Sequence, residues 1–426
     1  MTDDEAPAAT TGLTVIFNQT QQVYHFENVG GSTLLSLVDC QECGLNVGNI
    51  TSSAYKLYNY AMIGILLPAL ACFGVIGNVL AIYGFTRSKR LNSANAYLVC
   101  LAVSDICVIV TSVFMFTFEI LRSSYQIILE IYLGAIAIIF PIGTMAQTTS
   151  VYITVGAGID GFVAVCIPRC KRSYCRVNVT AASVGLVVLF ATVYNAPKFM
   201  EVVVIQCYDD ILNIIRRAVC ATTLRQNPLY AQIYYVYLYS IIMIVAPLLL
   251  LLLIALAIIF TTMQHRRRKQ KRCSVRSATS VATSAERVRN TTDDTDDPVV
   301  LIMVVVLFIV CNSLGFIINL LEAFANLEML MYYLVDLSNF LVVVNSSVNI
   351  IIYLSCSPPF RMRIVRLGKT FLQSRISNTS TLLTNTYHTE FRTVDHTDTS
   401  PTLKEILSIL YAAHSHPEWL LDDVKL

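Results

Sequence analysis

The sequence predicts an all-α membrane protein: a seven-transmembrane helix bundle with a short amphipathic eighth helix and disordered termini. Composition is the first reason. Only 14% of the 426 residues are charged and 55% are hydrophobic, whereas soluble domains carry about 25% charged residues. The second and third reasons are a series of seven long apolar stretches and an uneven distribution of basic residues between the segments that connect them.

Each apolar stretch is long enough for a helix, because a helix crosses the bilayer core with about 20 apolar residues, whereas a barrel strand needs only about 10. The second stretch contains one charge, Asp105, and the others contain none. In chain order, the stretches lie between Lys56 and Arg87 and at Leu91–Phe118, Ile131–Ile159, Val177–Pro197, Gln226–Gln264, Pro298–Leu321 and Leu337–Phe360.

The basic residues predict the orientation of the chain. If the N-terminus is outside, the inner segments carry 24 of the 30 Lys and Arg residues and the outer segments carry six. Cytoplasmic segments of membrane proteins show this enrichment. We therefore expect an extracellular tail at 1–55, a transmembrane domain at 56–367 and a cytosolic Ser/Thr-rich tail at 368–426. The acidic start does not resemble a signal peptide, so the first span is expected to direct its own insertion.

Sites for covalent modification lie in the predicted outer and cytosolic tails. Asn18 and Asn49 begin Asn-x-Thr tripeptides, which accept N-glycans. Phosphorylation of the Ser and Thr residues within 374–402 could create an arrestin docking site, and Leu403–Tyr411 is expected to form a short amphipathic helix.

The outer cysteines are even in number, which is compatible with two disulfides in an oxidising compartment; they are Cys40, Cys43, Cys207 and Cys220.

Polar side chains within the spans indicate a buried pocket for a small cation. An ionisable residue inside a span is costly to bury and is usually functional, and Asp105 is the only formal charge near the middle of a span. Asn345 and Asn349 are four residues apart and so share a helix face. The alternative is that these groups only join helices by hydrogen bonds. The full set is Asn78, Asp105, Ser150, Asn345, Ser346 and Asn349.

Several function classes are excluded by what the spans lack. A retinal protein needs a Schiff-base Lys in the last span, and Leu337–Phe360 contains none. Transporters usually carry several intramembrane charges and internal repeats, which we do not find. All six His residues lie outside the spans, and no metal-ligand set or phosphate loop is present. Neither an enzyme nor a cofactor is expected, apart from a cation beside Asp105.

Motifs in the first, second and last spans resemble those of rhodopsin-like (class A) G-protein-coupled receptors. They are Gly77-Asn78-Val79, the series from Asn95 to Asp105 (N-x-Y-L-x-x-L-A-x-S-D) and Asn349-x-x-x-Tyr353. Four longer strings are similar to the FMRFamide-type neuropeptide receptors of invertebrates, particularly the nematode branch; they lie within Tyr194–Glu201, Thr223–Tyr230, Phe308–Glu322 and Asp336–Asn349. The resemblance covers roughly residues 56–367.

This resemblance implies a function as well as a fold. A receptor of this branch would span the plasma membrane in contact with its lipids, bind an extracellular amidated peptide, and act on a heterotrimeric G protein, an arrestin or both. No nucleic-acid partner is implied. The resemblance also identifies the cation as an allosteric sodium ion, because the superfamily's sodium pocket matches Asp105, Ser150, Asn345, Ser346 and Asn349.

The chain departs from the superfamily pattern at several positions. Asp160-Gly161-Phe162 stands in place of Asp/Glu-Arg-Tyr, so the arginine that engages the G protein is missing. Ile136 stands where a Cys would tether the second outer loop, which implies that Cys207 and Cys220 pair with each other. Two alternatives to a signalling receptor remain: a non-signalling, decoy or arrestin-biased peptide binder, and a receptor for small chemosensory ligands.

The predicted outer segments are strongly acidic, with fourteen Asp and Glu residues against six Lys and Arg. Such a field attracts cationic ligands and speeds their encounter with the receptor. An Arg-Phe-amide peptide, implied by the resemblance, carries a guanidinium that pairs best with a carboxylate. We expect Glu201 and Glu322 near the pocket mouth to bind it, with Glu119 and Asp336 as further candidates.

Overall fold

The computed structural model of this chain describes residues 16–17, 23–29, 32–37, 52–87, 92–209, 214–276, 298–324, 328–370 and 373. The predicted glycosylation sites Asn18 and Asn49 and the predicted helix Leu403–Tyr411 lie outside these residues. The boundaries proposed for the two tails are not tested by the described part of the chain.

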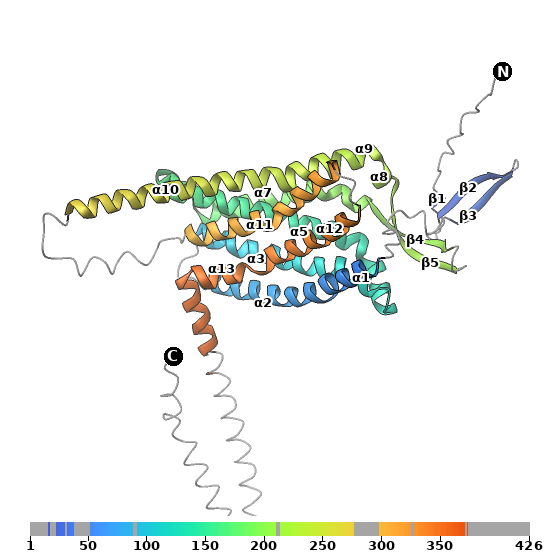
Figure 1. Ribbon diagram of the computed structural model, residues 1–426, viewed down its shortest axis with the longest axis horizontal. Helices are drawn as coiled ribbons and strands as arrows, with labels where there is room; N and C mark the ends of the chain where they lie inside the picture. Colours follow the sequence, from blue (N-terminus) through green and yellow to red (C-terminus); the bar gives the residue numbers. More distant parts are fainter. Residues whose placement is uncertain are drawn as a thin grey trace, which may run out of the picture. The chain divides into compact units, whose positions relative to one another are not determined.

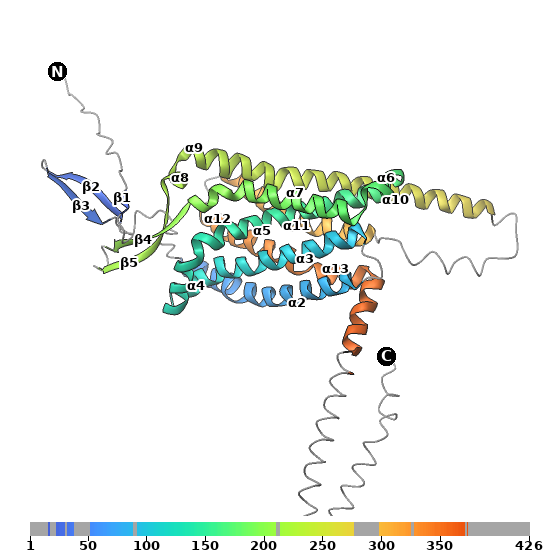
Figure 2. The ribbon, with the colours of Figure 1, turned by 180° about the vertical axis from the view of Figure 1, so that it is seen from behind.

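The predicted bundle of seven apolar helices is confirmed. Six helical segments of the described chain are long and apolar enough to cross a bilayer, and α11 (Pro298–Phe324) contains a shorter apolar helix, Ile302–Ile318. Figures 1 and 2 show these helices side by side from opposite directions. The six long segments are Ser53–Thr86, Ser93–Leu121, Gln126–Cys166, Val177–Met200, Pro228–His265 and Met329–Cys356.

Several spans are built from more than one helical element. Short π-helical and 3₁₀ segments (η) adjoin α-helices within the same span. The helical elements besides α11 are α1 (Ser53–Asn59), η2 (Tyr60–Leu66), α2 (Leu67–Thr86), α3 (Ser93–Ser112), η3 (Val113–Thr117), α4 (Phe118–Leu121), α5 (Gln126–Cys166), α6 (Pro168–Tyr174), α7 (Val177–Asn195), η4 (Ala196–Met200), α8 (Thr223–Gln226), α9 (Pro228–Tyr230), η5 (Ala231–Leu238), η6 (Ser240–Val245), α10 (Ala246–Arg276), α12 (Glu328–Ser347) and α13 (Asn349–Cys356).

Local sequence explains where several of these helices begin. The Asn92 side chain caps α3 by accepting a hydrogen bond from the Asn95 backbone N–H at 2.8 Å, as expected of Asn at an N-cap. Asn227 caps α9 in the same way, and Pro228 occupies the first helical position, where a missing N–H costs nothing. Polar caps therefore stand at the ends of apolar segments.

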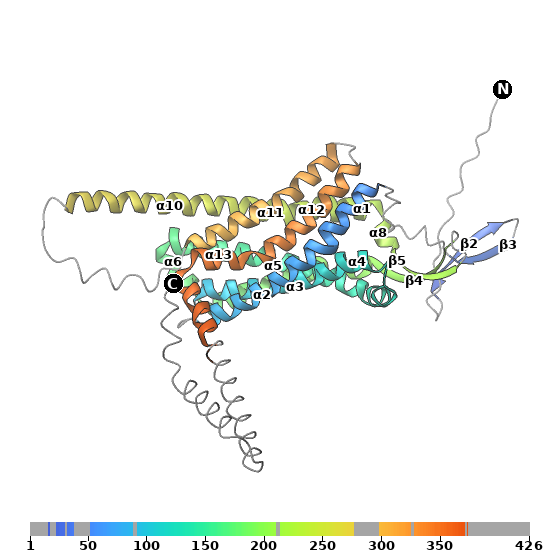
Figure 3. The ribbon, with the colours of Figure 1, turned by 60° about the horizontal axis from the view of Figure 1, so that its bottom comes forward.

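Helices α5 and α10 are longer than the apolar stretches that predict them. α5 begins at Gln126, five residues before the predicted start, and α10 continues to Arg276 through a strongly basic segment. Charge marks the membrane boundary but does not end a helix, since Lys, Arg, Glu and Gln are good helix formers. Figure 3 shows α10 extending beyond the neighbouring helices.

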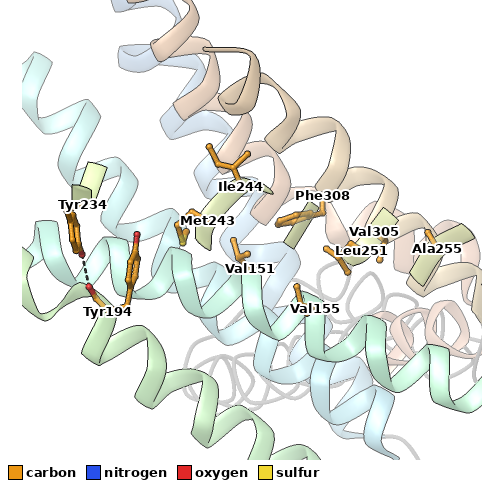
Figure 4. Close-up of a cluster of buried hydrophobic side chains, with 10 residues drawn as sticks. All are labelled: Val151, Val155, Tyr194, Tyr234, Met243, Ile244, Leu251, Ala255, Val305 and Phe308. Carbon is orange, nitrogen blue, oxygen red and sulfur yellow. Dashed lines mark hydrogen bonds between the residues drawn. The ribbon is translucent and has the colours of Figure 1, made fainter. Parts of the chain in front are cut away.

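Helix α5 packs against α3, α7, α10 and α11 and is central to the bundle. The main core cluster joins it to the fifth and sixth spans, through Val151 and Val155 of α5, Leu251 of α10 and Phe308 of α11. Figure 4 shows these side chains pointing toward one another. At the outer end of the cluster, the Tyr234 hydroxyl donates to the Tyr194 carbonyl oxygen at 2.6 Å.

Glycines allow α2 to approach the seventh span closely. A Cβ atom added at Gly77 would lie 2.7 Å from Cγ2 of Ile350, and one added at Gly74 would lie 2.3 Å from the Ser347 hydroxyl oxygen. Small residues at such contacts are typical of membrane helix packing, where van der Waals contact replaces the hydrophobic effect between helices. The Gly-Asn motif of the first span therefore serves packing as well as polar contacts.

Two antiparallel sheets lie outside the helices. In the N-terminal segment, β1 (Ile16–Phe17), β2 (Val23–Val29) and β3 (Ser32–Leu37) form a three-stranded sheet, which departs from the prediction of a disordered terminus. Strands β2 and β3 are separated by Gly30-Gly31, a pair that favours two-residue hairpins. Between the fourth and fifth spans, β4 (Val202–Asp209) pairs with β5 (Ile214–Ala221).

The chain turns after α13 because Ser357 is extended and Pro358 and Pro359 follow it; a residue before proline disfavours the α conformation. Residues 358–370 then form another helix. Phe360 in its first turn is fully buried and stacks against Phe85 and Tyr353, with ring centroids 4.8 and 5.7 Å apart. This helix directly follows the last span and was not predicted from the sequence at 358–370.

We predict that Gly77→Ala destabilises the receptor, because Ile350 must move to admit the extra methyl group. Overpacking of this kind costs about 1–3 kcal/mol. A fall of several degrees in the melting temperature of the purified receptor would measure it. Gly185→Ala in α7 is the matched control, since no atom lies within 4 Å of a Cβ added there. Equal melting temperatures for the two variants would contradict the packing role.

Candidate functional site

Asp105 lies at the centre of the bundle and is fully buried. Its carboxylate accepts a hydrogen bond at Oδ1 from the Ser150 hydroxyl, at 2.7 Å, and at Oδ2 from the Asn349 amide, at 2.9 Å. These contacts join α3, α5 and α13, so three of the polar residues predicted to form one pocket are brought together.

Two further described residues of the predicted set, Asn78 and Asn345, do not contact the Asp105 carboxylate by hydrogen bonds. The Asn78 amide donates to the backbone oxygens of Gly74 and Ser346, at 2.9 and 2.8 Å, and so ties α2 to α12. Asn345 is half-buried and makes no hydrogen bond to Asp105 in the described part of the chain. The Asn349 Oδ1 atom is buried without a partner. Neighbouring side chains thus carry carboxylate, hydroxyl and amide oxygens, which are the kinds of ligand that a hard cation prefers.

The local backbone positions Asn349. Helix α12 ends at Ser347 and α13 begins at Asn349, with Val348 between them at φ −92° and ψ 0°. This conformation lies in the sparsely populated bridge region. Ile350 follows Asn349, so the interruption forms here without a proline ring.

At the inner end of α5, Asp160 is buried and anchors two neighbouring elements. Its carboxylate accepts a hydrogen bond from the Ser93 hydroxyl at 2.8 Å, and its backbone oxygen lies 3.7 Å from the Cys175 sulfur. Burial, and then the adjacent Asp160, raises the pKa of the Cys175 thiol to about 11. Gly161 and Phe162 follow in α5 and are partly buried. The predicted motif position therefore connects α5 to the start of α3 and to the end of α6.

At the outer end, Glu201 has no exposed surface. Its carboxylate accepts hydrogen bonds from the hydroxyl groups of Tyr230, at 2.6 Å, and Tyr235. It also forms an ion pair with the Arg225 guanidinium at 3.2 Å. A buried carboxylate is tolerated when its oxygens are paired in this way. A ligand could reach the Glu201 carboxylate only by displacing one of these internal donors.

Lys198 lies beside this acid in a cage of aromatic rings. It is 4% exposed, and its ammonium nitrogen lies 5.7 Å from the ring centroid of Phe140 and 5.8 Å from those of Tyr234 and Tyr235. Cation–π contacts of this length are attractive. Sequence reasoning did not identify Lys198, Arg225 or the tyrosines as a unit, because they come from η4, α8, α9 and η5.

The other predicted ligand acids are in separate places. Asp336 of α12 accepts hydrogen bonds from the Tyr55 hydroxyl and the Asn59 amide, at 2.9 and 2.8 Å, and joins the seventh span to the first. Glu119 pairs with Arg122 at 3.5 Å on a partly exposed surface. Glu322 belongs to α11, and its side chain lies outside the described residues.

Two small cavities lie between Asp105 and the outer end of the bundle. One, of about 30 Å³, is lined by residues that include Gln147, Asn312 and Ser338. The other, of about 40 Å³, also borders Gln147 and includes Thr111 and Asn339. Each has room for about one or two waters and is too small for a peptide side chain. Gln147 was not singled out from the sequence, although a Gln within an uncharged span is the signal that could have found it.

The hairpin β4–β5 contains two disulfide-bonded cysteines, Cys207 and Cys220. They are not opposite each other, because Cys207 pairs across the hairpin with Arg216 and Cys220 pairs with Val203. The offset of four residues separates their Cα atoms by about 13 Å along the strands, whereas a disulfide allows about 4.4–6.8 Å. The prediction that Cys207 and Cys220 bond to each other is therefore wrong.

Comparison of the sequence with known proteins identifies a family and several relatives. The family model for the rhodopsin family of 7 transmembrane receptors matches residues 77–353. A probable G-protein coupled receptor of Caenorhabditis elegans, frpr-1, is 35% identical over 324 residues, covering 72% of this chain and 79% of the relative. An FMRFamide receptor of Drosophila melanogaster is 27% identical, covering 70% of this chain and 52% of the relative.

An FMRFamide peptide receptor of Caenorhabditis elegans, frpr-18, is 29% identical over 306 residues, covering 70% of this chain and 66% of the relative. These similarities confirm the resemblance to receptors of the FMRFamide branch, and the helical bundle confirms a multi-pass membrane protein. The chain belongs to the rhodopsin family of seven-transmembrane receptors.

Proposed function

We propose that this protein is a cell-surface receptor for an FMRFamide-like amidated peptide and that it activates a G protein on the cytosolic side. It is a signalling receptor of the plasma membrane, not an enzyme, with its N-terminus outside. The similarity to frpr-1 over 72% of the chain supports the proposal. The structural observation that carries it is the buried Asp105 carboxylate, which joins α3 to α5 and α13, beside the Asn78 amide, which joins α2 to α12.

A hydrogen-bond network of this kind supports a receptor whose helices pack in two alternative ways. Ligands shift the populations of packings that differ in contacts. A buried carboxylate costs free energy unless it is paired, so helices that move apart must leave it with new partners. The cavities beside Gln147 are small, so a peptide would bind toward the outer ends of the helices and act on their packing.

A sodium ion beside Asp105 would stabilise the resting packing. We propose that the Asp105 carboxylate and the Ser150 hydroxyl bind it, and that the Asn349 Oδ1 atom, buried without a hydrogen-bond partner, completes the oxygen set. Ser346 and Asn345, on the same span, would line the site. The chemistry of the donor set supports this assignment, because these are hard oxygen ligands.

The first prediction concerns this ion. Replacing choline chloride with sodium chloride at constant ionic strength should weaken binding of an Arg-Phe-amide agonist by about fivefold or more, the usual scale of allosteric coupling. Constant ionic strength matters because the acidic outer surface is itself screened by salt. In Asp105→Asn, which keeps the side-chain volume and removes the charge, the sodium effect should vanish. Equal sodium sensitivity in the variant and the wild type would refute the site.

We further propose that the peptide's guanidinium takes the place of Arg225 against Glu201. The Arg225 side chain is 30% exposed while Glu201 is fully buried, so the arginine is the partner that a ligand can replace. Tyr230 and Tyr235 would continue to hold the carboxylate. The excess of acids on the outer segments would draw the cationic peptide toward this position.

This exchange predicts opposite effects for the two partners. Glu201→Gln should reduce the potency of an Arg-Phe-amide peptide about thirtyfold or more, since truncating one side of a buried charged pair costs about 2–5 kcal/mol. Arg225→Ala should raise potency, because the competing guanidinium is removed. Glu130→Gln is the control, as its exposed pair with Arg217 contributes about 0–1 kcal/mol. A loss of potency in Arg225→Ala would show that the arginine supports the site instead.

We predict that the resting state of the receptor is weakly stabilised at its G-protein-facing end. Gly161 supplies no guanidinium at the position where the superfamily pattern has an arginine. We expect high basal nucleotide exchange on G proteins in receptor-containing membranes, and lower basal exchange in Gly161→Arg. A silent basal state with strong agonist-dependent exchange in the wild type would contradict this prediction.

A further inference from the structure

The outer hairpin β4–β5 has two disulfide-bonded cysteines that cannot be each other's partners. Cys207 and Cys220 are both buried, and with Ile205 they form a small apolar cluster on one face of the hairpin. Their separation in the strand register excludes a bond between them. Each must therefore bond to a different cysteine elsewhere.

We propose that both are bonded to the N-terminal tail, through Cys40 and Cys43. Of the thirteen cysteines in the chain, eight in the described part are free thiols. Apart from the hairpin pair, the remaining cysteines are Cys40, Cys43 and Cys273. Cys273 is 27 positions beyond the start of α10, so it lies about 40 Å along that helix, at the end away from the hairpin (Figure 1).

The spacing of the four cysteines is compatible with two parallel cross-links. An extended chain places Cys40 and Cys43 up to about 10 Å apart, and each disulfide adds about 4.4–6.8 Å between Cα atoms. Together these lengths cover the offset of about 13 Å between Cys207 and Cys220. One short segment of the tail can therefore reach both strands, whereas a bond between Cys40 and Cys43 would leave both hairpin cysteines without partners.

The chemistry requires an oxidising compartment, and in this respect the inference rests on the proposed orientation. Each bond forms when two thiols lose two protons and two electrons to the disulfide of a thiol oxidoreductase, which is reduced to a dithiol. Such bonds persist on the outer side of the membrane and are rare in the cytosol. A shared outer location of the tail and the hairpin is the only further condition.

These links would act on the proposed ligand site. The strands of the hairpin begin and end beside this site. The Thr222 backbone N–H donates to the backbone carbonyl oxygen of Glu201 at 2.9 Å, and the Thr222 hydroxyl donates to that of Met200 at 2.6 Å. Cross-linking the hairpin to the tail restrains both chain segments that carry Glu201 and Arg225. The tail thus becomes a structural part of the outer site.

Peptide mapping of the full-length purified receptor tests the connectivity directly. Free thiols are blocked, N-glycans are removed, and the protein is digested with trypsin without reduction. Residues 1–55 contain no Lys or Arg, and Arg216 and Arg217 lie between the hairpin cysteines. We expect one species that contains peptides 1–56, 199–216 and 218–225 and that separates into three on reduction. Cleavage after Glu42 then assigns Cys40 and Cys43 to their partners.

Other products would overturn the proposal. Peptide 199–216 bound only to 218–225, with peptide 1–56 separate, would restore a bond within the hairpin. A disulfide-linked dimer on a non-reducing gel would place the partners on a second copy of the chain. Because mapping does not depend on ligand or G protein, it can fail without affecting the proposed receptor function, and an incorrect peptide ligand would leave its result unchanged.

Thiol counting provides the second test. Because Cys207 and Cys220 are buried, the receptor is unfolded in detergent without reduction before it is labelled with a maleimide. The Cys40→Ser and Cys43→Ser double variant should take up two more labels per chain than the wild type. Cys170→Ser, which removes an exposed free thiol on the predicted inner side, is the matched control and should take up one label fewer. Equal labelling of the double variant and the wild type would refute the cross-links.

Discussion

Burial of the Asp105 carboxylate constrains the packing of the whole inner bundle. Because a carboxylate without partners in this environment would cost several kcal/mol, Ser150 of α5 and Asn349 of α13 must reach it, and they fix the relative positions of three spans. Asn78 adds a fourth by binding the Ser346 carbonyl oxygen. The glycines of α2 make this possible, since Gly74 and Gly77 leave room for the seventh span.

The outer end is organised by a second buried acid, Glu201, which differs from the first in its partners. Its donors are an arginine and two tyrosines from the segments that follow the β4–β5 hairpin. A fully buried charge with a partly exposed partner can exchange that partner, whereas the partners of Asp105 are all internal. We therefore propose the first of these acids as the site of a small ion and the second as the site of a ligand from outside.

The fold class and the spans could be predicted from composition and charge, because a lipid solvent requires long uncharged helices with satisfied backbones. The joining of Asp105 to Ser150 and Asn349 was also predictable, since few polar groups are available inside the spans. Helix ends were less predictable: α5 and α10 continue through charged residues. The strands between 16 and 37 depart from the prediction of a disordered N-terminus.

The sequence by itself determined that this chain is a seven-helix membrane receptor, because its motifs and its hydropathy are properties of consecutive residues. Tertiary structure decided which acids face inward and which cysteines can meet. Glu201 is enclosed because Arg225, Tyr230 and Tyr235 return to it after a hairpin. Cys207 and Cys220 are kept apart by strand register. Both outcomes depend on contacts between segments distant in the chain, which no local pattern of residues encodes.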